Sequence, residues 1–371
     1  MLTLLSPLTA LLRLRRPSQA LVEQVAGPHV QSPETQSTCL CNPTVSDSNP
    51  SKRNSDEFWT PLKEFPFSSQ GQCILFLYKL TKELFVCKFI KFPMDESGNF
   101  IVPDEVATLV RHLGKHDRII DMVRVDYYRD EQLGPSLTLL MEYCDGGDLF
   151  DAMRKRRRKF GGRFPKTFLV HVFVQLAEAL AYIHHGLKKD DRTGAYSRES
   201  DSEWQPVVHC DLKPENVFLR TVPGQIYPDI VLGDFGLAAL ETDCPERGFA
   251  GTNGYMPPEF SEDPDAGNTT MSDVWMLGAV IHFLGTGKYA QDGVHRLSPA
   301  TYDYALDMCM QCCLRRRPQD RPTAETLVRC MLPALMSTLP VLHSATPAPQ
   351  SGWVGKMARF FGGCGKRMRA T

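Results

Sequence analysis

The sequence predicts an α+β fold, with a β-rich first part and a larger, mainly helical second part. Short apolar and aromatic runs separated by polar turns occupy residues 58–143 and are typical of strands, with one helix among them. A long run with few polar residues, from Phe168 to His185, predicts a buried helix. A chain of 371 residues is long enough for two such parts, or for one large domain with tails.

Charge and cysteine content narrow the class of protein. The 42 basic and 43 acidic residues nearly cancel, so no global field favours nucleic acid as a partner. The twelve cysteines are scattered without a secretory signal, which favours a reduced intracellular setting over a disulfide framework. Cys309, Cys312 and Cys313 could suggest a metal site, but no second ligand pair completes one, and their spacing favours an amphipathic helix.

Both ends of the chain have the composition of disordered tails. Residues 1–56 are rich in Pro, Ser, Thr, Asn and Gln from Pro28 onward, and residues 337–371 end in glycines, aromatics and basic side chains. The first twenty residues are apolar with three arginines, so a mitochondrial presequence is the alternative to a tail there. No uninterrupted run of about 18 apolar residues occurs, so no transmembrane segment is expected.

The β-rich part contains a lysine in an unusual place. The runs 73–78 and 84–90 are separated by a polar turn and predict a hairpin, and Lys88 lies inside the second strand. An outward-facing lysine on an edge strand is the less favoured interpretation, because the motifs further along the chain indicate a functional role for this lysine. Downstream, residues 103–111 predict a helix with acids in its first turn, Asp104 and Glu105, and an apolar face formed by Val106, Leu109, Val110 and Leu113.

The stretch from Val208 to Ala238 carries the chemistry. His209-Cys210-Asp211-Leu212-Lys213-Pro214-Glu215-Asn216 places an acid, a lysine and an amide on one tight loop, and Asp234-Phe235-Gly236 places a second acid after a predicted strand. These side chains are the types that phosphoryl transfer requires. A carboxylate accepts a hydroxyl proton, a lysine offsets phosphate charge, and an amide and a carboxylate hold Mg²⁺.

These runs resemble the H-R-D-L-x-x-x-N and D-F-G motifs of eukaryotic protein kinases. The resemblance implies a bilobal kinase fold, with a small antiparallel β-rich lobe at 57–143, a mainly helical lobe at 144–336, and ATP between them. Residues 188–206 then form a polar surface insertion. It implies a general base in Asp211, a phosphoryl-stabilising cation in Lys213, Mg²⁺ ligands in Asn216 and Asp234, and a phosphate-orienting pair in Lys88 and Glu105, with Asp104 as the competing partner.

The same resemblance implies an ATP site. Leu139–Leu149 is similar to the family's hinge, where Met141 guards the back pocket, Glu142 and Cys144 bind adenine through the main chain, and Asp148 lies near the ribose. The residues expected to bind the nucleotide are Gly71, Cys73, Val86, Lys88, Met141, Glu142, Cys144, Asp148, Phe218 and Asp234.

Two departures from the family pattern matter. The glycine-rich loop keeps only its third glycine, Gly71, whereas Pro66, Ser68 and Gln70 stand where two glycines and an aromatic are expected, and proline supplies no N–H for a phosphate. Cys210 replaces the arginine that binds a phosphorylated activation segment in many relatives. In residues 234–259 only Thr242 lies outside the fixed motif as a phosphorylation candidate. We therefore expect activity without activation-loop phosphorylation.

Other motifs refine the branch. Gly251–Glu259 resembles G-T-x-x-Y-M-x-P-E, which together with Lys213 is similar to the serine/threonine-directed branch, and Arg321 is expected to pair with Glu259. Val86–Lys88, Met141–Leu149, Asn216–Leu219 and Leu232–Ala238 are most similar to the NIMA-related (NEK) kinases. The six basic residues 154–159 could be a nuclear-import patch or a docking face, but the solvated side of a short helix is the favoured interpretation.

The sequence therefore predicts a serine/threonine kinase that uses ATP and Mg²⁺ to phosphorylate proteins in the cytoplasm or nucleus. The alternative is a pseudokinase scaffold or nucleotide-sensing module. This alternative rests on the glycine-rich loop, which lacks two of its three expected glycines. The residues that handle charge in the transition state are all present, which favours the enzyme.

Overall fold

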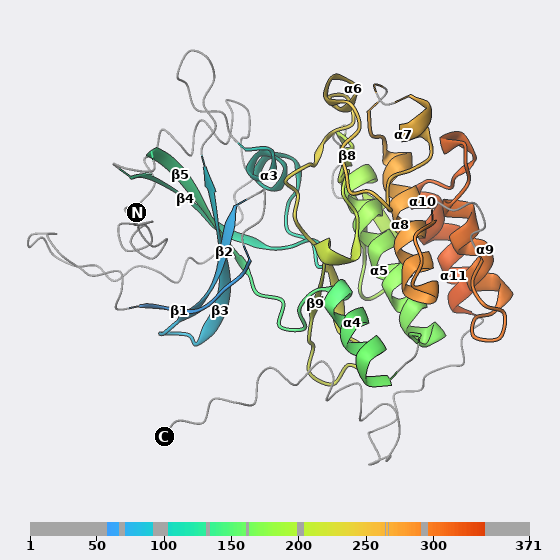
Figure 1. The fold of residues 1–371 in the computed structure, drawn as a ribbon, viewed down its shortest axis with the longest axis horizontal. Helices are drawn as coiled ribbons and strands as arrows, with labels where there is room; N and C mark the ends of the chain where they lie inside the picture. The colour runs from blue at the N-terminus through green and yellow to red at the C-terminus, as the bar shows by residue number, and fades with distance from the viewer. Residues whose placement is uncertain are drawn as a thin grey trace, which may run out of the picture. The chain divides into compact units, whose positions relative to one another are not determined.

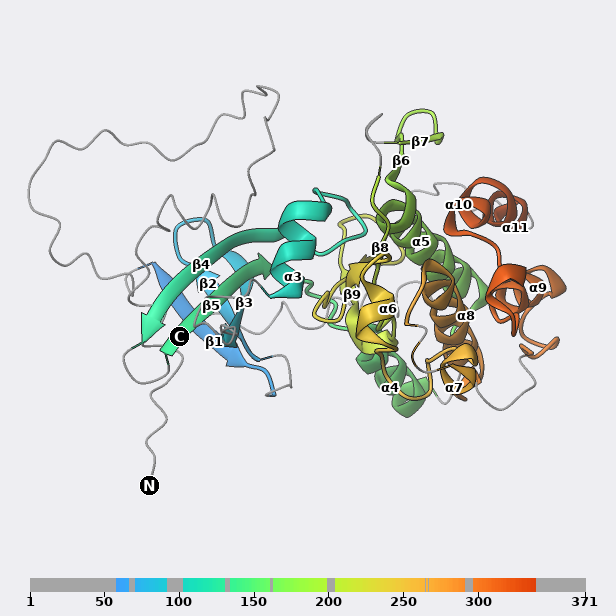
Figure 2. The same ribbon diagram turned by 90° about the horizontal axis from the view of Figure 1, so that it is seen from above.

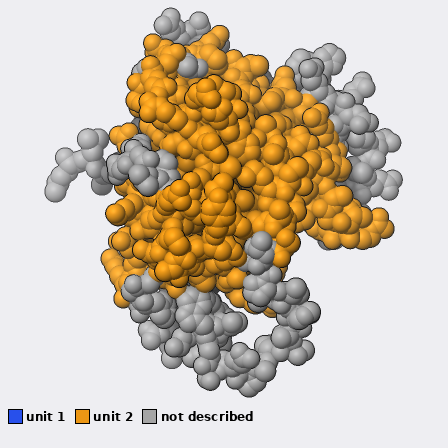
Figure 3. Space-filling model, turned by 90° about the vertical axis from the view of Figure 1, so that its right-hand side faces the viewer, with its two compact units in different colours: residues 1–111, 122–143 blue, residues 112–121, 144–371 orange. Residues whose placement is uncertain are grey.

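The fold is seen in a computed structural model, which describes residues 58–66, 71–91, 103–130, 134–160, 163–198, 204–263, 265, 267–290 and 296–337. The predicted N- and C-terminal tails lie outside these residues. The chain divides into two compact units, of which unit 1 comprises residues 1–111 and 122–143 and unit 2 comprises residues 112–121 and 144–371. Figure 3 shows one face of unit 2.

Unit 1 is built on a five-stranded antiparallel sheet in the order β1-β2-β3-β5-β4. Its strands are β1 (Trp59–Glu64), β2 (Gln72–Tyr78), β3 (Glu83–Lys91), β4 (Met122–Asp130) and β5 (Gly134–Glu142). The predicted hairpin is β2–β3, and β3 is the central strand (Figure 1). Ile74, Phe76, Cys87, Phe89 and Leu140 form one buried cluster on this sheet, so its core is contributed by alternate positions of neighbouring strands.

One helical segment accompanies the sheet and lies beside β4 and β5 in both ribbon views (Figures 1 and 2). It consists of α3 (Asp104–Ala107) followed by a wider π-helical turn, η2 (Thr108–His112). The predicted apolar face is correct for Val106, Leu109 and Leu113, which are buried, but wrong for Val110, which is 41% exposed. The π turn changes the angular spacing of side chains that an α-helical pattern assumes, which explains this difference.

Unit 2 is mainly helical, so the α+β fold class is confirmed. Its two long helices, α5 (Lys166–His185) and α8 (Thr270–Thr286), run side by side and are buried along nearly their whole length (Figure 2). By length and composition α5 could cross a membrane, but 89% of its apolar window is buried within the protein. It is therefore the core helix that the sequence predicts.

The remaining elements of unit 2 surround these two helices. Unit 2 also contains three short antiparallel strand pairs: β8 with β11, β9 with β10, and β6 with β7. The bounds are α4 (Leu149–Phe160), β6 (Leu187–Lys189), β7 (Tyr196–Arg198), β8 (Val207–Val208), η3 (Pro214–Asn216), β9 (Val217–Arg220), β10 (Asp229–Leu232), β11 (Ala239–Leu240), α6 (Cys244–Arg247), α7 (Glu259–Glu262), α9 (Tyr304–Cys313), η5 (Pro318–Asp320), α10 (Ala324–Thr326), η6 (Leu327–Met331) and α11 (Leu332–Met336).

Two predictions about unit 2 need comment. Cys309, Cys312 and Cys313 lie in helix α9, and no cluster of three His, Cys, Asp or Glu suited to a metal occurs among the residues that the structure describes. The basic run 154–159 lies in α4, as expected, but it is not a uniformly solvated face. Arg156 is only 6% exposed, because its guanidinium packs over the ring of Phe164 and donates to the carbonyl of Arg163.

Candidate active site

In unit 1 the central feature is a buried ion pair. Lys88 Nζ lies 2.6 Å from Glu105 Oε2, and their side chains are 6% and 3% exposed. Lys88 is on the central strand β3, so the interpretation as an outward-facing edge lysine is wrong. The partner is Glu105, whereas Asp104, one residue earlier on α3, is exposed. A charged pair this deeply buried costs desolvation, so it marks a place where the charge is needed.

The sheet register places the other unit 1 candidates next to this lysine. Cys73 is the cross-strand partner of Lys88, and Val86 is the partner of Met141. Glu142 ends β5 opposite Phe85. Met141 is buried, while Cys73, Val86 and Glu142 are half-buried. Five of the expected nucleotide-binding residues (Cys73, Val86, Lys88, Met141, Glu142) thus lie on three adjacent strands.

Gly71 occupies a position that only glycine tolerates. Its φ is +128°, and a Cβ built there would lie 2.2 Å from the carbonyl oxygen of Phe89. The backbone therefore passes directly against β3 at the start of β2. Pro66 is exposed, and Ser68 and Gln70 lie outside the described residues.

In unit 2 the loop 209–216 is held by hydrogen bonds to a residue of helix α8. The carboxylate of Asp273, which is fully buried, accepts hydrogen bonds from the backbone N–H groups of His209 (2.8 Å) and Cys210 (3.0 Å). His184 Nε2 contacts the same carboxylate at 2.9 Å. Cys210 has φ of +66°, a left-handed conformation that costs energy for a non-glycine residue, and the bonds to Asp273 offset that cost.

The loop presents Asp211 in a tight polar cluster. Lys213 Nζ donates to Asp211 Oδ2 at 2.7 Å and to Thr252 Oγ1 at 2.7 Å, and Thr252 Oγ1 donates to Asp211 Oδ1 at 2.7 Å. Asn216 Nδ2 donates to the Asp211 backbone oxygen at 2.9 Å and to Oδ2 at 3.2 Å. Both carboxylate oxygens are thus held in fixed directions. The residue is also buried, since Asp211 is only 4% exposed.

Strand pairing brings the second acid to the same loop. Val217 of β9 pairs with Leu232 of β10, and Gly233 N donates to the Asn216 carbonyl at 3.0 Å. Asp234, the next residue, has φ of +61°. Asn216 contacts Asp211 through Nδ2, so these bonds do not use its amide oxygen, and Asp234 follows two residues after the end of β10. An amide oxygen and a carboxylate suit Mg²⁺, which is usually held by one or two carboxylates together with phosphates and water.

The expected ribose-side residues lie along the start of α4. Asp148 forms a bridge with Phe218 of β9, and its Oδ1 accepts the N–H of Asp151, capping α4. Burial raises the pKa of Asp148 above its usual value. Cys144 is buried, and the N–H of Gly147 donates to its carbonyl. Asp148 therefore has a structural role in capping, whatever else it binds.

Cys210 faces the activation segment. Its side chain lies in a buried cluster with Val208, Ala239 and Cys244, and the interaction with the neighbouring Cys244 side chain, together with burial, raises the pKa of Cys210 far above its usual value. The position that carries an arginine in many similar sequences is therefore neutral and apolar here. Sequence reasoning did not identify Cys244, because nothing in its local pattern points to this contact.

The activation segment is secured at its far end as well. Arg321 Nη2 and Nη1 donate to the two oxygens of Glu259 at 2.5 and 2.7 Å, which confirms the predicted pair. Asn268 was not predicted, yet its side-chain amide both accepts from and donates to the backbone of Ala250. These contacts fix the segment on either side of Thr252.

With the geometry established, comparison with known proteins identifies the family. Residues 68–331 match the model of the protein kinase domain. The chain belongs to the protein kinase domain family.

Several curated relatives of this chain are NIMA-related kinases. The chain is 30% identical over 306 residues to the serine/threonine-protein kinase Nek1 of Toxoplasma gondii, which covers 75% of this chain and 18% of the relative. It is 28% identical over 289 residues to mouse serine/threonine-protein kinase Nek3, covering 73% of this chain and 48% of the relative. The chain thus spans less than half the length of these relatives, and its likeness is to NIMA-related serine/threonine kinases.

Proposed function

We propose that this kinase-family protein is an enzyme that transfers the γ-phosphate of ATP to serine or threonine hydroxyls of protein substrates. The observation that carries the proposal is the cluster of Asp211, Lys213 and Thr252, in which three contacts of 2.7 Å hold a carboxylate, an ammonium and a hydroxyl together. Lysine two residues after the acid, with threonine in the G-T-x-x-Y motif, is the pattern of the serine/threonine-directed branch.

The residues of unit 2 would perform the chemistry as follows. A substrate hydroxyl oxygen bonds to the γ-phosphorus while the bond from that phosphorus to the β–γ bridging oxygen breaks. The hydroxyl proton passes to Asp211, whose carboxylate cannot rotate away because Lys213 donates to Oδ2 and Thr252 donates to Oδ1. Lys213 offsets the negative charge that spreads over the transferring group. The products are a phosphate ester and ADP.

Each unit, taken by itself, offers residues suited to binding a nucleotide or a metal ion. Mg²⁺, where bound, neutralises phosphate charge, and Asn216 and Asp234 supply oxygens for it in unit 2. In unit 1, Lys88 would donate to the α- and β-phosphates, and its 2.6 Å contact with Glu105 fixes the direction of its ammonium. Asp148 at the ribose, and Met141, Glu142 and Cys144 at the adenine, complete the proposed set.

We propose further that activity does not require phosphate on the activation segment. The support is the cluster of Cys210 and Cys244: a neutral thiol stands where a cation would be needed to hold a phosphate, and an apolar contact already joins the catalytic loop to the segment. Thr242, the candidate phosphorylation site, has its hydroxyl bonded to the neighbouring Asp243 carboxylate.

The test is phosphate transfer from γ-labelled ATP with Mg²⁺ to a mixture of serine/threonine substrates, comparing the full chain with Asp211→Asn. We expect transfer by the first and at least a hundredfold loss in the second, since a general base contributes roughly that factor. Thr242→Ala and phosphatase-treated protein test the second statement, and both are expected to keep the full rate. A rate that depends on phosphate at Thr242 would contradict it.

A pseudokinase scaffold is the second candidate, and one observation favours it. Pro66 stands where the first glycine of the phosphate-covering loop is expected and offers no N–H, so fewer backbone donors remain for phosphates. If the full chain transfers no phosphate and ATP does not raise its unfolding temperature, the scaffold is the better account. Stabilisation by ATP without transfer would instead indicate a nucleotide-sensing module.

The domain limits and the location in the cell are also proposals. We place the kinase domain at residues 57–336, with tails on either side, in the cytoplasm or nucleus. A fusion of residues 1–56 to a fluorescent protein tests the mitochondrial alternative, because a presequence would carry the reporter to that organelle.

A further inference from the structure

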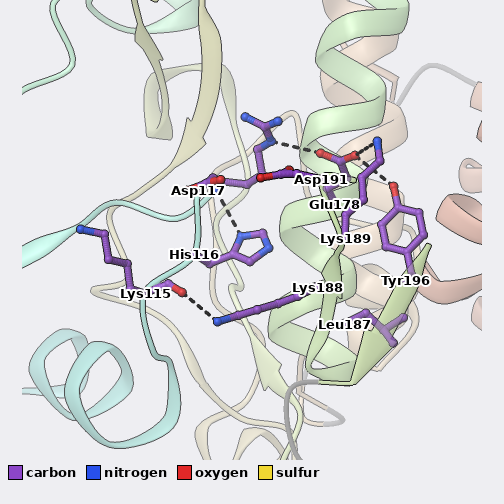
Figure 4. A pocket seen from close by; sticks show the side chains of 10 residues that line it. Lys115, His116, Asp117, Glu178, Leu187, Lys188, Lys189, Asp191 and Tyr196 are labelled. Atoms are coloured by element: carbon purple, nitrogen blue, oxygen red, sulfur yellow. Dashed lines mark hydrogen bonds and ion pairs between the residues drawn. The ribbon is translucent and has the colours of Figure 1, made fainter. Parts of the chain in front are cut away.

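Two cavities of unit 2 are lined by charged side chains, and they differ in how those charges are balanced. The first, of about 220 Å³, lies between α5, the β6–β7 hairpin and the turn at Lys115–Arg118 (Figure 4). Glu178 on α5 accepts hydrogen bonds from Arg118, Lys189 and Tyr196, each at 3.0 Å, and Lys115 pairs with Asp121. This cavity neutralises its own charge, so it fastens the hairpin to α5 and has little left to attract a ligand.

The second cavity is not balanced in this way. It has a volume of about 240 Å³ and lies where α4 meets the C-terminal end of α8. Three arginines line it, and no acidic residue appears among the described residues of its wall. The lining residues are Met153, Arg156, Arg157, Arg163, Phe164, Phe283, Leu284, Thr286 and Gly287.

Two of the three arginines have defined neighbours in the fold. Arg156 is 6% exposed, with its Nε bonded to the Arg163 carbonyl at 2.8 Å and its guanidinium 5.4 Å from the centre of the Phe164 ring. Burial lowers the pKa of Arg156, which means that the surroundings disfavour its charge. The guanidinium of Arg157 lies over Gly287, where a Cβ would come within 3.2 Å of Nη2.

The surface around the cavity has the same sign. Helix α4 carries six basic residues and one acid, Asp151, which pairs with Arg154 at 3.5 Å. Arg154, Lys155, Arg157 and Arg158 are exposed on it, and Arg163 is exposed at its far end. The floor, in contrast, is apolar, because Met153, Phe164, Phe283 and Leu284 are all at most 5% exposed.

We propose that this site binds an acidic segment of a partner protein, with an aliphatic side chain inserted on the apolar floor and carboxylates on Arg157 and Arg163. Guanidinium groups match carboxylates in bidentate geometry, which fits Arg157 and Arg163. The volume is below that of cavities which bury a drug-sized molecule, so it suits one or two inserted side chains. A nucleic acid is less suited, since the chain as a whole carries a net charge of −1 and the run on α4 holds only six of its 42 basic residues.

Fluorescence anisotropy tests the proposal on the full chain. The probe is a fluorescein-labelled ten-residue peptide of aspartate and glutamate with one central leucine, and the reference peptide has asparagine and glutamine in place of the acids. The variant is Arg157→Gln with Arg163→Gln, and the matched control is Arg192→Gln with Arg198→Gln, which removes two exposed arginines from the β6–β7 region. Binding needs no turnover, so the result does not depend on the proposed kinase activity.

We expect the acidic peptide to bind more tightly than the reference peptide, and more weakly as salt increases. Affinity should fall at least about tenfold in the Arg157/Arg163 variant, because each lost charged hydrogen bond is worth roughly that factor, and it should not change in the control. Equal binding of both peptides, or equal affinity in the two double variants, would overturn the proposal. So would a single-stranded oligonucleotide that displaces the probe as well as unlabelled acidic peptide does.

Folding is checked by thermal unfolding of both double variants. If the Arg157/Arg163 variant is destabilised, Arg163→Lys replaces it, since this change keeps the charge and removes the bidentate fork. A fall of severalfold in affinity at an unchanged unfolding temperature supports the proposal, and an unchanged affinity contradicts it.

Discussion

The hydroxyl of Thr252 donates a 2.7 Å hydrogen bond to Asp211 Oδ1, joining the activation segment to the catalytic loop across 41 residues of sequence. The same hydroxyl accepts a hydrogen bond from Lys213. One threonine therefore contacts both the proposed base and the proposed phosphoryl-stabilising cation. The geometry of the two charged groups is therefore set by a neutral side chain.

Replacing Thr252 should impair catalysis more than folding. We expect Thr252→Val to lower kcat about ten- to a hundredfold, because hydrogen bonds to charged groups are worth about 1.5–3 kcal/mol each, while Thr252→Ser should keep most of the rate. Steady-state phosphate transfer measures the effect, and urea unfolding checks the fold. Equal rates for the valine and serine variants would show that the hydroxyl is not needed.

The Lys88–Glu105 pair allows stability and activity to be separated. Lys88→Met or Glu105→Gln alone leaves a buried charge without its partner, so each should reduce the free energy of unfolding by about 3 kcal/mol or more. The double variant Lys88→Met with Glu105→Leu should regain most of that stability and remain inactive. Chemical denaturation and a transfer assay measure the two quantities, and a double variant as unstable as the singles would contradict the argument.

Introducing the family's usual arginine at position 210 should be damaging. Cys210 is 2% exposed in a cluster of Val208, Ala239 and Cys244, so Cys210→Arg would bury a charge and overfill the site, at a cost of about 3 kcal/mol or more. Cys210→Ala should cost far less. Cys330→Arg, at an exposed cysteine, is the matched control and should leave the unfolding midpoint unchanged.

His116 should make stability fall in mild acid. Burial, with a smaller contribution from Lys188, lowers the pKa of His116 to about 4, and the ring stacks on Tyr182 with 4.3 Å between centroids. Between pH 4 and the unfolded value of 6.5 the unfolded chain binds more protons, so stability is complete above pH 6.5 and decreases as pH falls toward 4. His116→Phe keeps the stack and removes the titration, so its unfolding free energy should vary less from pH 7 to 5. His185, whose pKa burial also lowers to about 4, should account for part of the remaining slope.

Much of the fold and of the candidate site could be predicted because the chemistry constrains neighbours in sequence. Asp211, Lys213 and Asn216 lie on one loop of eight residues, and Asp234 follows the strand that pairs with the loop's own strand. The partner of Arg321 was predicted 62 residues away, because both ends belong to motifs of the family.

The features that sequence reasoning missed depend on packing between distant segments. Val110 faces outward because η2 is a π-helical turn, and no single residue type in the sequence predicts such a turn. Arg156 turns inward because the chain beyond α4 returns Phe164 and the Arg163 carbonyl to it. The contact of Cys210 with Cys244 depends on the pairing of β8 with β11. Each of these strands has only two residues, which is too short to be predicted from the sequence pattern.

The dependence of the 209–211 backbone on Asp273 has a consequence for the order of folding. Asp273 belongs to α8, more than sixty residues further along the chain, and both of its carboxylate oxygens are used by backbone N–H groups of the loop. Until α8 docks, Cys210 has nothing to hold it in the left-handed region, so the loop relaxes to ordinary conformations. During synthesis from the N-terminus, Asp211 is therefore made early but reaches its working geometry only after residue 273 has emerged.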